Sequence, residues 1–137
     1  MNTVIAVIVS YNNSAMLQSL LADIASQSRP PDRIIVVDNS SSDGTQEVIK
    51  TQFPAIDYMR MPENTGSAGG YYHGMKAALE KSHYIWTLDD DVRLYPDTLD
   101  ELLKGFGSLK RSCKLGAVRS VGATHPDVRP TRLHIIS

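Results

Sequence analysis

The sequence lacks several features that would place it in particular protein classes. Its 137 residues include one cysteine, Cys113, which excludes an internal disulfide and a cysteine-cluster zinc site and fits a reducing compartment. A net charge of −1 provides no basic field, so we expect no nucleic-acid partner. The apolar run at 4–9 is too short for a signal-peptide core or a membrane span. Together these absences predict a cytoplasmic protein.

Strand and helix patterns alternate along the chain. Continuous β-branched runs are typical of strands that are buried on both faces, and apolar residues at helical spacing predict amphipathic helices between them. The predicted strands cover 4–9, 34–37, 56–61, 84–88 and 116–121, and the predicted helices cover 14–24, 43–52, 71–81 and 96–109. Ser14 is the expected N-cap of the first helix.

This alternation predicts an α/β fold with a doubly wound, mostly parallel sheet and helices on both faces. Right-handed crossovers then place the carboxyl ends of all the strands at one edge of the sheet. We expect one domain over 1–122, and an irregular tail over 123–137 because Pro126 and Pro130 oppose a long element.

Three consecutive aspartates, Asp89, Asp90 and Asp91, follow the apolar strand at 84–88. Neighbouring carboxylates repel one another by ~1–4 kcal/mol, and a divalent cation would turn this repulsion into attraction. The first and third aspartates of an extended segment point the same way, and their hard oxygen atoms suit Mg²⁺ or Mn²⁺. A solvated acidic turn that caps the next helix is the competing interpretation.

Three other polar segments follow predicted strands: Ser10-Tyr11-Asn12, Asp38-Asn39-Ser40 and the glycine-rich stretch 64–70. Ligands of doubly wound sheets bind outside the carboxyl ends of the strands. Tyr11 and Asn12 offer a ring and an amide to a base, and Asp38 suits a base N–H or ribose hydroxyls. Glycines let the backbone approach a ligand closely, and N–H groups at a helix start favour anionic oxygens. The four segments therefore predict a site for a nucleoside diphosphate and a metal.

Taken in order, these segments resemble the successive motifs of the family 2 inverting glycosyltransferases, which have the GT-A fold. The matching stretches are 7–12, 36–45, 64–70 and 88–91, and their order and spacing agree across 4–122. The stretch from Asn64 to Tyr71 and the triple aspartate look most like the bacterial rhamnosyl- and galactofuranosyltransferase branch.

The resemblance implies a role for each of these residues. It implies that Asp38 contacts the base or ribose of the donor and that Asp89 and Asp91 bind Mn²⁺ or Mg²⁺. Asp90 would lie nearer the sugar. The other implied donor-binding residues line the uracil or thymine pocket or shape the pyrophosphate and sugar side: Ser10, Tyr11, Asn12, Asn39, Asn64, Gly66, Gly69 and Gly70.

The activity that the resemblance implies is metal-assisted transfer of a sugar from a UDP- or dTDP-linked donor to a saccharide or lipid-linked acceptor. A lipid-linked acceptor would bring the protein to the inner face of the membrane. The family's general base is an Asp or Glu well beyond the aspartate motif. It has no clear counterpart before Ser137, because Asp127 is the only carboxylate after Glu101 and its surroundings do not resemble the family. We therefore expect the donor half of a larger enzyme, and an exposed apolar edge of such a half would favour a homodimer.

Other classes of protein use a similar site. A sugar nucleotidyltransferase would have a phosphate loop rich in glycine and arginine after the first strand, where this chain has Ser10-Tyr11-Asn12-Asn13. A phosphatase or phospho-acceptor domain would have an aspartate there. A donor-binding module without turnover, or a truncated inactive transferase, stays open, and retained hydrolysis of the donor would distinguish an enzyme from either.

Overall fold

The computed structural model describes residues 2–109, 117–120 and 133–136. These residues belong to two compact units, one formed by 1–26 and 30–94 and the other by 27–29 and 95–137. All four strands of the central sheet lie in the first unit, so this unit contains the sheet edge at which the polar segments were expected.

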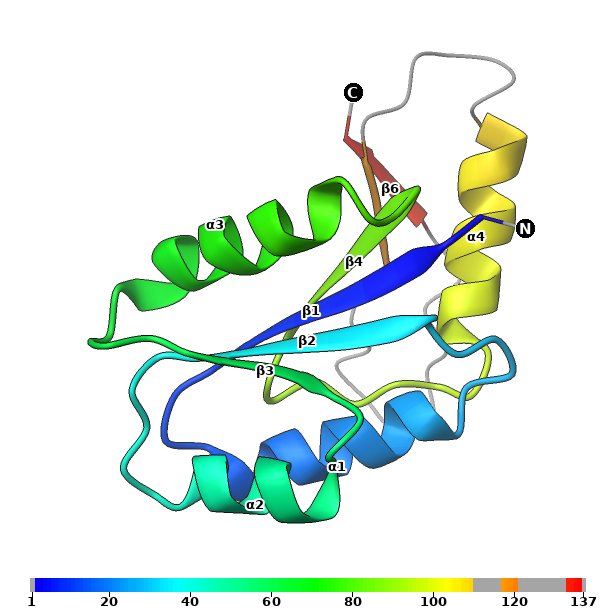
Figure 1. Ribbon diagram of the computed structural model, residues 1–137. Helices are drawn as coiled ribbons and strands as arrows, with labels where there is room; N and C mark the ends of the chain where they lie inside the picture. Colours follow the sequence, from blue (N-terminus) through cyan, green and yellow to red (C-terminus); the bar gives the residue numbers. More distant parts are fainter. Residues whose placement is uncertain (1, 110–116, 121–132, 137) are drawn as a thin grey trace. The chain divides into compact units, whose positions relative to one another are not determined.

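The first unit is built on a sheet of four parallel strands (Figure 1). The strands are β1 (Val4–Ser10), β2 (Arg33–Asp38), β3 (Asp57–Arg60) and β4 (Tyr84–Asp89), in the spatial order β3-β2-β1-β4. Every residue of β1 is buried, as a strand between two neighbours and two helical layers requires. The predicted parallel α/β sheet is confirmed.

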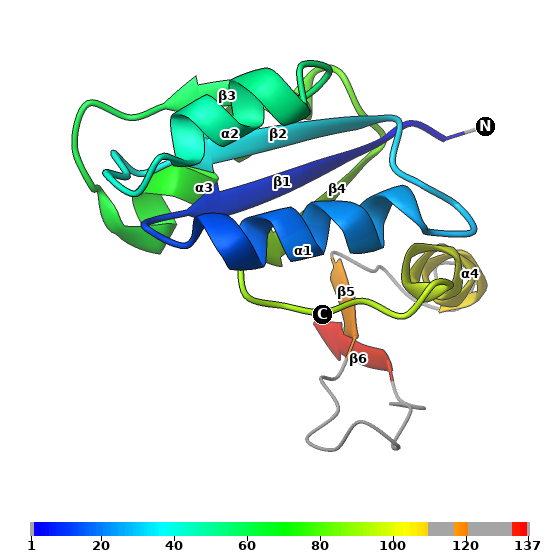
Figure 2. The ribbon, with the colours of Figure 1, turned by 90° about the horizontal axis from the view of Figure 1, so that it is seen from below.

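Helices cover both faces of this sheet. Figures 1 and 2 show α1 (Ser14–Ala25) and α2 (Thr45–Gln52) on one face and α3 (Gly66–Leu79) on the other. The buried side chains of α1 follow helical spacing and are Leu17, Leu20, Leu21 and Ile24. On the opposite face, alternate residues of β1 and β2 form one apolar cluster with Ala78 of α3 and Met61. The sheet is therefore doubly wound.

The start of α1 is held by a residue that is distant in the sequence. The N-cap position is occupied by Asn13, so the prediction of Ser14 as N-cap is wrong. The Ser14 amide instead donates to Oδ2 of Asp43 at 2.9 Å, across a separation of 29 residues. Burial alone raises the pKa of Asp43, but hydrogen bonds from Thr45 and Ser14 outweigh it and lower the pKa overall. A local sequence pattern cannot reveal a capping side chain that belongs to another loop.

α3 begins at Gly66, five residues before the start that was predicted from the sequence. Gly66 has φ +72°, a left-handed conformation that suits glycine, and its N–H donates to Oδ1 of Asn64 at 2.9 Å. The stretch 66–70, which lay outside the predicted helix, is therefore the beginning of α3.

Small residues let α3 pack closely on β1. Gly70, Gly74 and Ala78 are buried and lie four residues apart, on one side of the helix. A Cβ atom on Gly70 would lie 2.6 Å from Cγ1 of Val9, and one on Gly74 would lie 2.4 Å from Cγ1 of Val7. These contacts are too short for any side chain, so this spacing of the helix and the sheet requires glycine.

The segment after β4 is fastened to α1. Arg93 donates from Nε and Nη2 to the two carboxylate oxygens of Asp23, at 2.7 and 2.9 Å, and the Leu94 N–H adds a third bond at 3.0 Å. The hydrogen bond from Arg93 is the main reason that the pKa of Asp23 is lowered. The turn that carries the three aspartates is thus anchored on its downstream side.

The second unit contains α4 (Thr98–Leu109) and an antiparallel pair, β5 (Ala117–Ser120) and β6 (Leu133–Ile136). The Gln27 side chain donates to the Tyr95 carbonyl at 2.7 Å and accepts from the Leu99 N–H at 3.0 Å. β5 lies within the strand predicted at 116–121, but β6 was not predicted. Its apolar residues suit a strand, and the two prolines that argued for an irregular tail precede it.

Several predicted features lie outside the described residues, namely Cys113, Pro126, Asp127 and Pro130. Within the described part of the chain, no helix is long and apolar enough to cross a membrane.

The Gly74→Ala variant tests the close packing of α3. The added methyl would meet Val7 and Val37 within 3.0 Å, and overpacking of this kind costs ~1–3 kcal/mol in the free energy of unfolding. Gly107→Ala in α4 is the matched control, because nothing lies within 4 Å of its added methyl. It should raise stability by ~0.5–1 kcal/mol through helix propensity. Urea denaturation measures the free energy of unfolding of both variants. Equal changes in Gly74→Ala and Gly107→Ala would contradict the packing argument.

The pair of Asp23 and Arg93 should make stability depend on acid pH. Because the pKa of Asp23 is lowered from 3.8, its contribution is present above about pH 4 and is lost as the pH falls through the folded-state value. Arg93→Ala should therefore be less stable than the wild type at neutral pH, with the difference shrinking at pH 2–3.

Arg33→Ala is the control for this experiment. Its partner Asp57 and Arg33 itself are about half exposed, so the change should cost close to nothing. Urea midpoints between pH 2.5 and 7 measure both variants. A difference between wild type and Arg93→Ala that stays constant down to pH 2.5 would exclude the proposed linkage.

Candidate functional site

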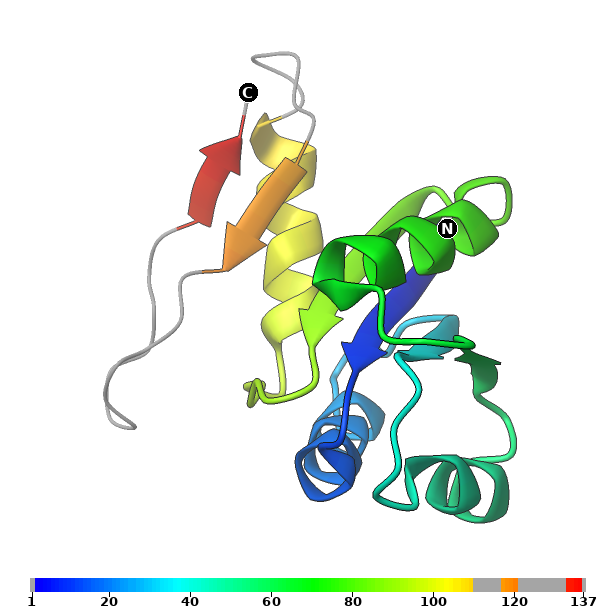
Figure 3. The ribbon, with the colours of Figure 1, turned by 90° about the vertical axis from the view of Figure 1, so that its left-hand side faces the viewer.

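A cavity of about 420 Å³ opens at the carboxyl ends of the strands, the edge of the sheet that faces the viewer in Figure 3. Its lining comes from the end of β1, the loop after β2, the start of α3 and the turn after β4. The lining residues are Val9, Ser10, Tyr11, Asn39, Asn64, Gly66, Ser67, Asp89, Asp90 and Asp91. The four polar segments singled out in the sequence all contribute.

The register of the sheet explains why these segments meet. Ser10 pairs with Asp38 across β1 and β2, and Val9 pairs with Asp89 across β1 and β4. In parallel strands that end level, the first residues of the following loops are brought side by side. The structure thus brings the four polar segments together at one edge, while the roles of their residues toward a ligand remain predictions.

Asp90 faces the protein. Its carboxylate accepts from Oγ of Ser10 at 2.7 Å, from Nδ2 of Asn13 at 3.0 Å and from the Tyr11 N–H at 3.4 Å. Asn13 is the N-cap residue of α1, so Asp90 ties the turn after β4 to the entrance of that helix. Most of the acceptor capacity of Asp90 is therefore used within the fold.

Asp89 and Asp91 are exposed at the cavity. Oδ1 of Asp89 accepts from the Tyr71 hydroxyl at 2.7 Å, which leaves Oδ2 available. Within the described part of the chain, the structure gives the Asp91 carboxylate no hydrogen bond, and no set of three His, Cys, Asp or Glu side chains is arranged to hold a metal. Two carboxylates fit Mg²⁺ or Mn²⁺ when phosphate and water oxygens complete the coordination.

Tyr71 remains protonated beside these carboxylates. Burial is the main cause that raises its pKa, and the hydrogen bond to Asp89 and the charges of all three aspartates raise it further. The phenol is therefore a donor over the whole physiological pH range. Tyr71 does not line the cavity, although its hydroxyl contacts Asp89, which does.

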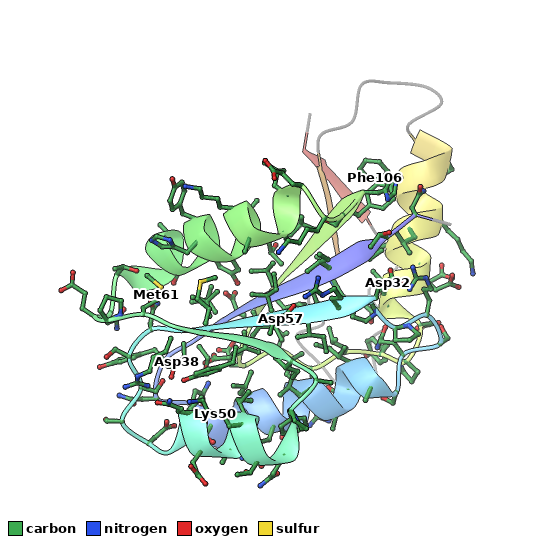
Figure 4. The ribbon with its side chains drawn as sticks, viewed as in Figure 1. Asp32, Asp38, Lys50, Asp57, Met61 and Phe106 are labelled. Carbon is green, nitrogen blue, oxygen red and sulfur yellow. The ribbon has the colours of Figure 1, made fainter. Side chains whose placement is uncertain are left out.

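Asp38, at the end of β2 (Figure 4), is fully buried and does not line the cavity. One of its oxygens accepts from Nη1 of Arg60 at 2.8 Å and from the Tyr58 hydroxyl, and the other accepts from the Ser41 N–H at 2.9 Å. Burial and the hydrogen bond to Asp38 raise the pKa of Tyr58 to about 12. In this conformation a ligand cannot reach Asp38, and its implied contact with a base or ribose stays a prediction.

Two asparagines connect the loops around the cavity. Asn39 lines the cavity, and its Nδ2 donates to the Gly66 carbonyl at 3.0 Å, which joins the loop after β2 to the start of α3. Asn12 has φ +47° and does not line the cavity. Its N–H donates to Oγ of Ser41 at 2.9 Å and its Oδ1 accepts from the Ser42 N–H at 2.7 Å, which joins the loops after β1 and β2.

The glycines of the predicted site divide into two groups. Gly66 lines the cavity, together with Asn64. Gly70 faces Val9 of the sheet, and a Cβ atom on Gly69 would meet Oγ1 of Thr65 at 2.3 Å. Because Gly69 and Gly70 do not line the cavity, their implied contact with the pyrophosphate stays a prediction.

Three residues at this edge were missed from the sequence: Asn13, Ser67 and Tyr71. A usable signal existed, because Gly70, Gly74 and Ala78 repeat at the four-residue interval of a helix face. Recognising that repeat would have started the helix in the glycine-rich stretch and placed Tyr71 beside its sheet-facing side.

Comparisons with known proteins agree with this architecture. The chain is 37% identical to the galactofuranosyltransferase GlfT1 of Mycolicibacterium smegmatis over 91 residues, covering 66% of this chain and 30% of that protein. It is 31% identical to the poly-beta-1,6-N-acetyl-D-glucosamine synthase of Staphylococcus epidermidis over 113 residues, covering 79% of this chain and 26% of that protein. The chain thus spans less than a third of the length of these relatives.

Solved structures share the fold. The crystal structure of S. aureus TarS in complex with UDP aligns with a TM-score of 0.67 at 19% identity, over 77% of this chain and 32% of that one. The mannosyltransferase PcManGT from Pyrobaculum calidifontis, in complex with GDP-Man and Mn²⁺, aligns with a TM-score of 0.65 at 25% identity, covering 77% of this chain and 32% of that one. The family model described as Glycosyl transferase family 2 matches residues 5–134, and the chain therefore belongs to this family.

Proposed function

We propose that this chain forms the donor-binding part of an inverting glycosyltransferase that uses a UDP- or dTDP-linked sugar. The observation that carries this proposal is the cavity in which the carboxylates of Asp89 and Asp91 face Tyr11, Asn39 and the start of α3. The acceptor would be a saccharide or a lipid-linked saccharide, and a lipid-linked acceptor would place the enzyme at the membrane surface.

The nucleotide would lie along the loops after β1 and β2. Tyr11 is 49% exposed at the cavity, so its ring is free to stack on a pyrimidine base. The Asn39 amide faces the same cavity and can hydrogen-bond to a base edge. Asp38 would act from behind, because its bond to the Ser41 N–H holds the loop that presents Asn39.

The diphosphate would lie between the start of α3 and the aspartates. Gly66 and Ser67, in the first turn of α3, line this space, and the positive end of a helix dipole favours anionic oxygens. Oδ2 of Asp89 and the carboxylate of Asp91 would hold Mg²⁺ or Mn²⁺. When bound, such an ion neutralises the charge that develops on the departing nucleoside diphosphate as an acceptor hydroxyl attacks the anomeric carbon.

A second candidate is a donor-binding module that does not turn the donor over. The carboxylates that line the cavity are Asp89, Asp90 and Asp91. Asp90 is held by the protein, and the other two are assigned to the metal, so none of these three remains as a general base for the acceptor. Hydrolysis of the donor by the chain would favour an enzyme over a binding module.

The Asp91→Ala variant tests the donor site. Calorimetric titration with UDP or dTDP in Mn²⁺ should show binding to the wild type that weakens by at least tenfold in the variant, because one of two protein ligands of the metal is lost. Addition of EDTA should weaken wild-type binding to a similar extent. The dTDP and UDP titrations together also indicate which base the pocket prefers.

Asp57→Ala is the matched control for this titration. Asp57 begins β3, at the end of the sheet opposite the cavity, and pairs with Arg33 at the surface. Its loss should leave nucleotide binding unchanged. If neither nucleotide binds the wild type with or without Mn²⁺, the donor-site proposal is wrong.

The Asp38→Asn variant tests whether Asp38 supports the loop or contacts the donor. A supporting role predicts a loss of ~1–3 kcal/mol in the free energy of unfolding, because Tyr58 and Arg60 lose the charged acceptor that the fully buried Asp38 provides. Asp57→Asn, at an exposed ion pair, should change stability by less than ~1 kcal/mol. Unchanged stability of Asp38→Asn together with lost UDP binding would instead indicate direct contact.

A further inference from the structure

The three aspartates differ in how the protein holds them. Asp90 is bound by Ser10, Tyr11 and Asn13 at the end of β1 and in the loop after it, and Asp91 has no hydrogen bond within the described residues. In the part of the chain that the structure describes, Asp89 has a single hydrogen-bond partner, the hydroxyl of Tyr71, at 2.7 Å. This partner belongs to a different element, α3, and contacts only one of the two carboxylate oxygens. Tyr71 therefore occupies Oδ1 of Asp89 and leaves Oδ2 available.

The packing of α3 determines the position of the Tyr71 hydroxyl. Gly70, the preceding residue, lies so close to the sheet that its Cβ would be 2.6 Å from Cγ1 of Val9. Val9 in turn pairs with Asp89 across β1 and β4. The close contact at Gly70 thus brings the second turn of α3 next to the end of β4.

The Tyr71 ring is itself held by apolar contacts. It packs against the cluster formed by alternate residues of β1 and β2, and Ile85 of β4 packs against the same cluster. Ile85 and Asp89 lie four residues apart in β4 and therefore point to the same face of the sheet. A tyrosine has two rotatable side-chain bonds, so a packed ring presents its hydroxyl with little conformational freedom.

We propose that Tyr71 is a positioning residue that holds Oδ1 of Asp89 and thereby presents Oδ2 to the divalent cation of the donor site. This inference rests on the proposed function, because it concerns the metal that the donor site is expected to use. An exposed aspartate at the end of an edge strand would otherwise sample several rotamers. A hydrogen bond to the oxygen that does not bind the metal orients a carboxylate ligand.

The experiment compares Tyr71→Phe with Tyr72→Phe. Tyr71→Phe retains the ring in the apolar cluster and removes only the hydroxyl that Asp89 accepts. Tyr72 is 60% exposed, its ring contacts His73 and Lys76, and it does not line the cavity, so its variant controls for loss of a tyrosine hydroxyl from the same helix.

Two titrations are made on the full 137-residue chain. Mn²⁺ alone is titrated by electron paramagnetic resonance of the free ion, and UDP is titrated by calorimetry in Mn²⁺ and in EDTA. Tyr71→Phe should weaken Mn²⁺ binding and Mn²⁺-dependent UDP binding by ~10–100-fold. In EDTA, the affinity of Tyr71→Phe for UDP and its melting temperature should match those of Tyr72→Phe.

The outcomes separate the possible failures. If the wild type shows Mn²⁺-dependent UDP binding and Tyr71→Phe matches it, the positioning role is wrong and the proposed function stands. If Tyr71→Phe weakens UDP binding equally in Mn²⁺ and in EDTA, the hydroxyl has a structural or nucleotide-contacting role, and the inference is likewise wrong. If the wild type binds neither Mn²⁺ nor UDP, the proposed function is wrong and the role of Tyr71 with it.

Discussion

The close contact between α3 and β1 is the constraint on which the candidate site depends. Gly70 and Gly74 let the helix approach until no Cβ atom would fit, and Ala78 extends the same face. This approach places the start of α3 beside the ends of β1 and β2, where Asn39 bonds to the Gly66 carbonyl. A helix held farther from the sheet by larger side chains would move its first turn and Tyr71 away from the cavity.

The cavity combines exposed groups with groups that the fold has already bound. Asp38 and Asp90 are acceptors for several protein donors, so they hold loops in place at the ends of β2 and β4. Asp89, Asp91 and Tyr11 are exposed at the same edge and are available to a ligand. The hydrogen-bonded carboxylates limit the conformational freedom of the loops that carry the exposed ones. A site that is already ordered loses less conformational entropy when it binds a ligand.

The sequence and the structure agree best where a pattern reports local physics. Continuous apolar runs identified β1, β2 and β4, and turn residues located the polar segments at their ends. The predictions failed where the deciding contact was distant in the chain. The Ser14 amide at the start of α1 donates to Asp43 of another loop. The glycine-rich stretch packs on the sheet as a helix, and there Gly70 lies too close to Val9 for any side chain. β6 was missed because nearby prolines suggested a tail without regular structure.

By itself, the sequence determined that this chain forms a parallel α/β sheet and that four polar segments, ending in Asp89 and Asp91, follow its strands. Those properties depend on the spacing of apolar residues and on the direction of the crossovers. Only the tertiary structure decided that Asp38 and Asp90 face inward while Tyr71 contacts Asp89. The direction in which a carboxylate points depends on which donors the packed helices bring near it, and those donors lie far away along the chain.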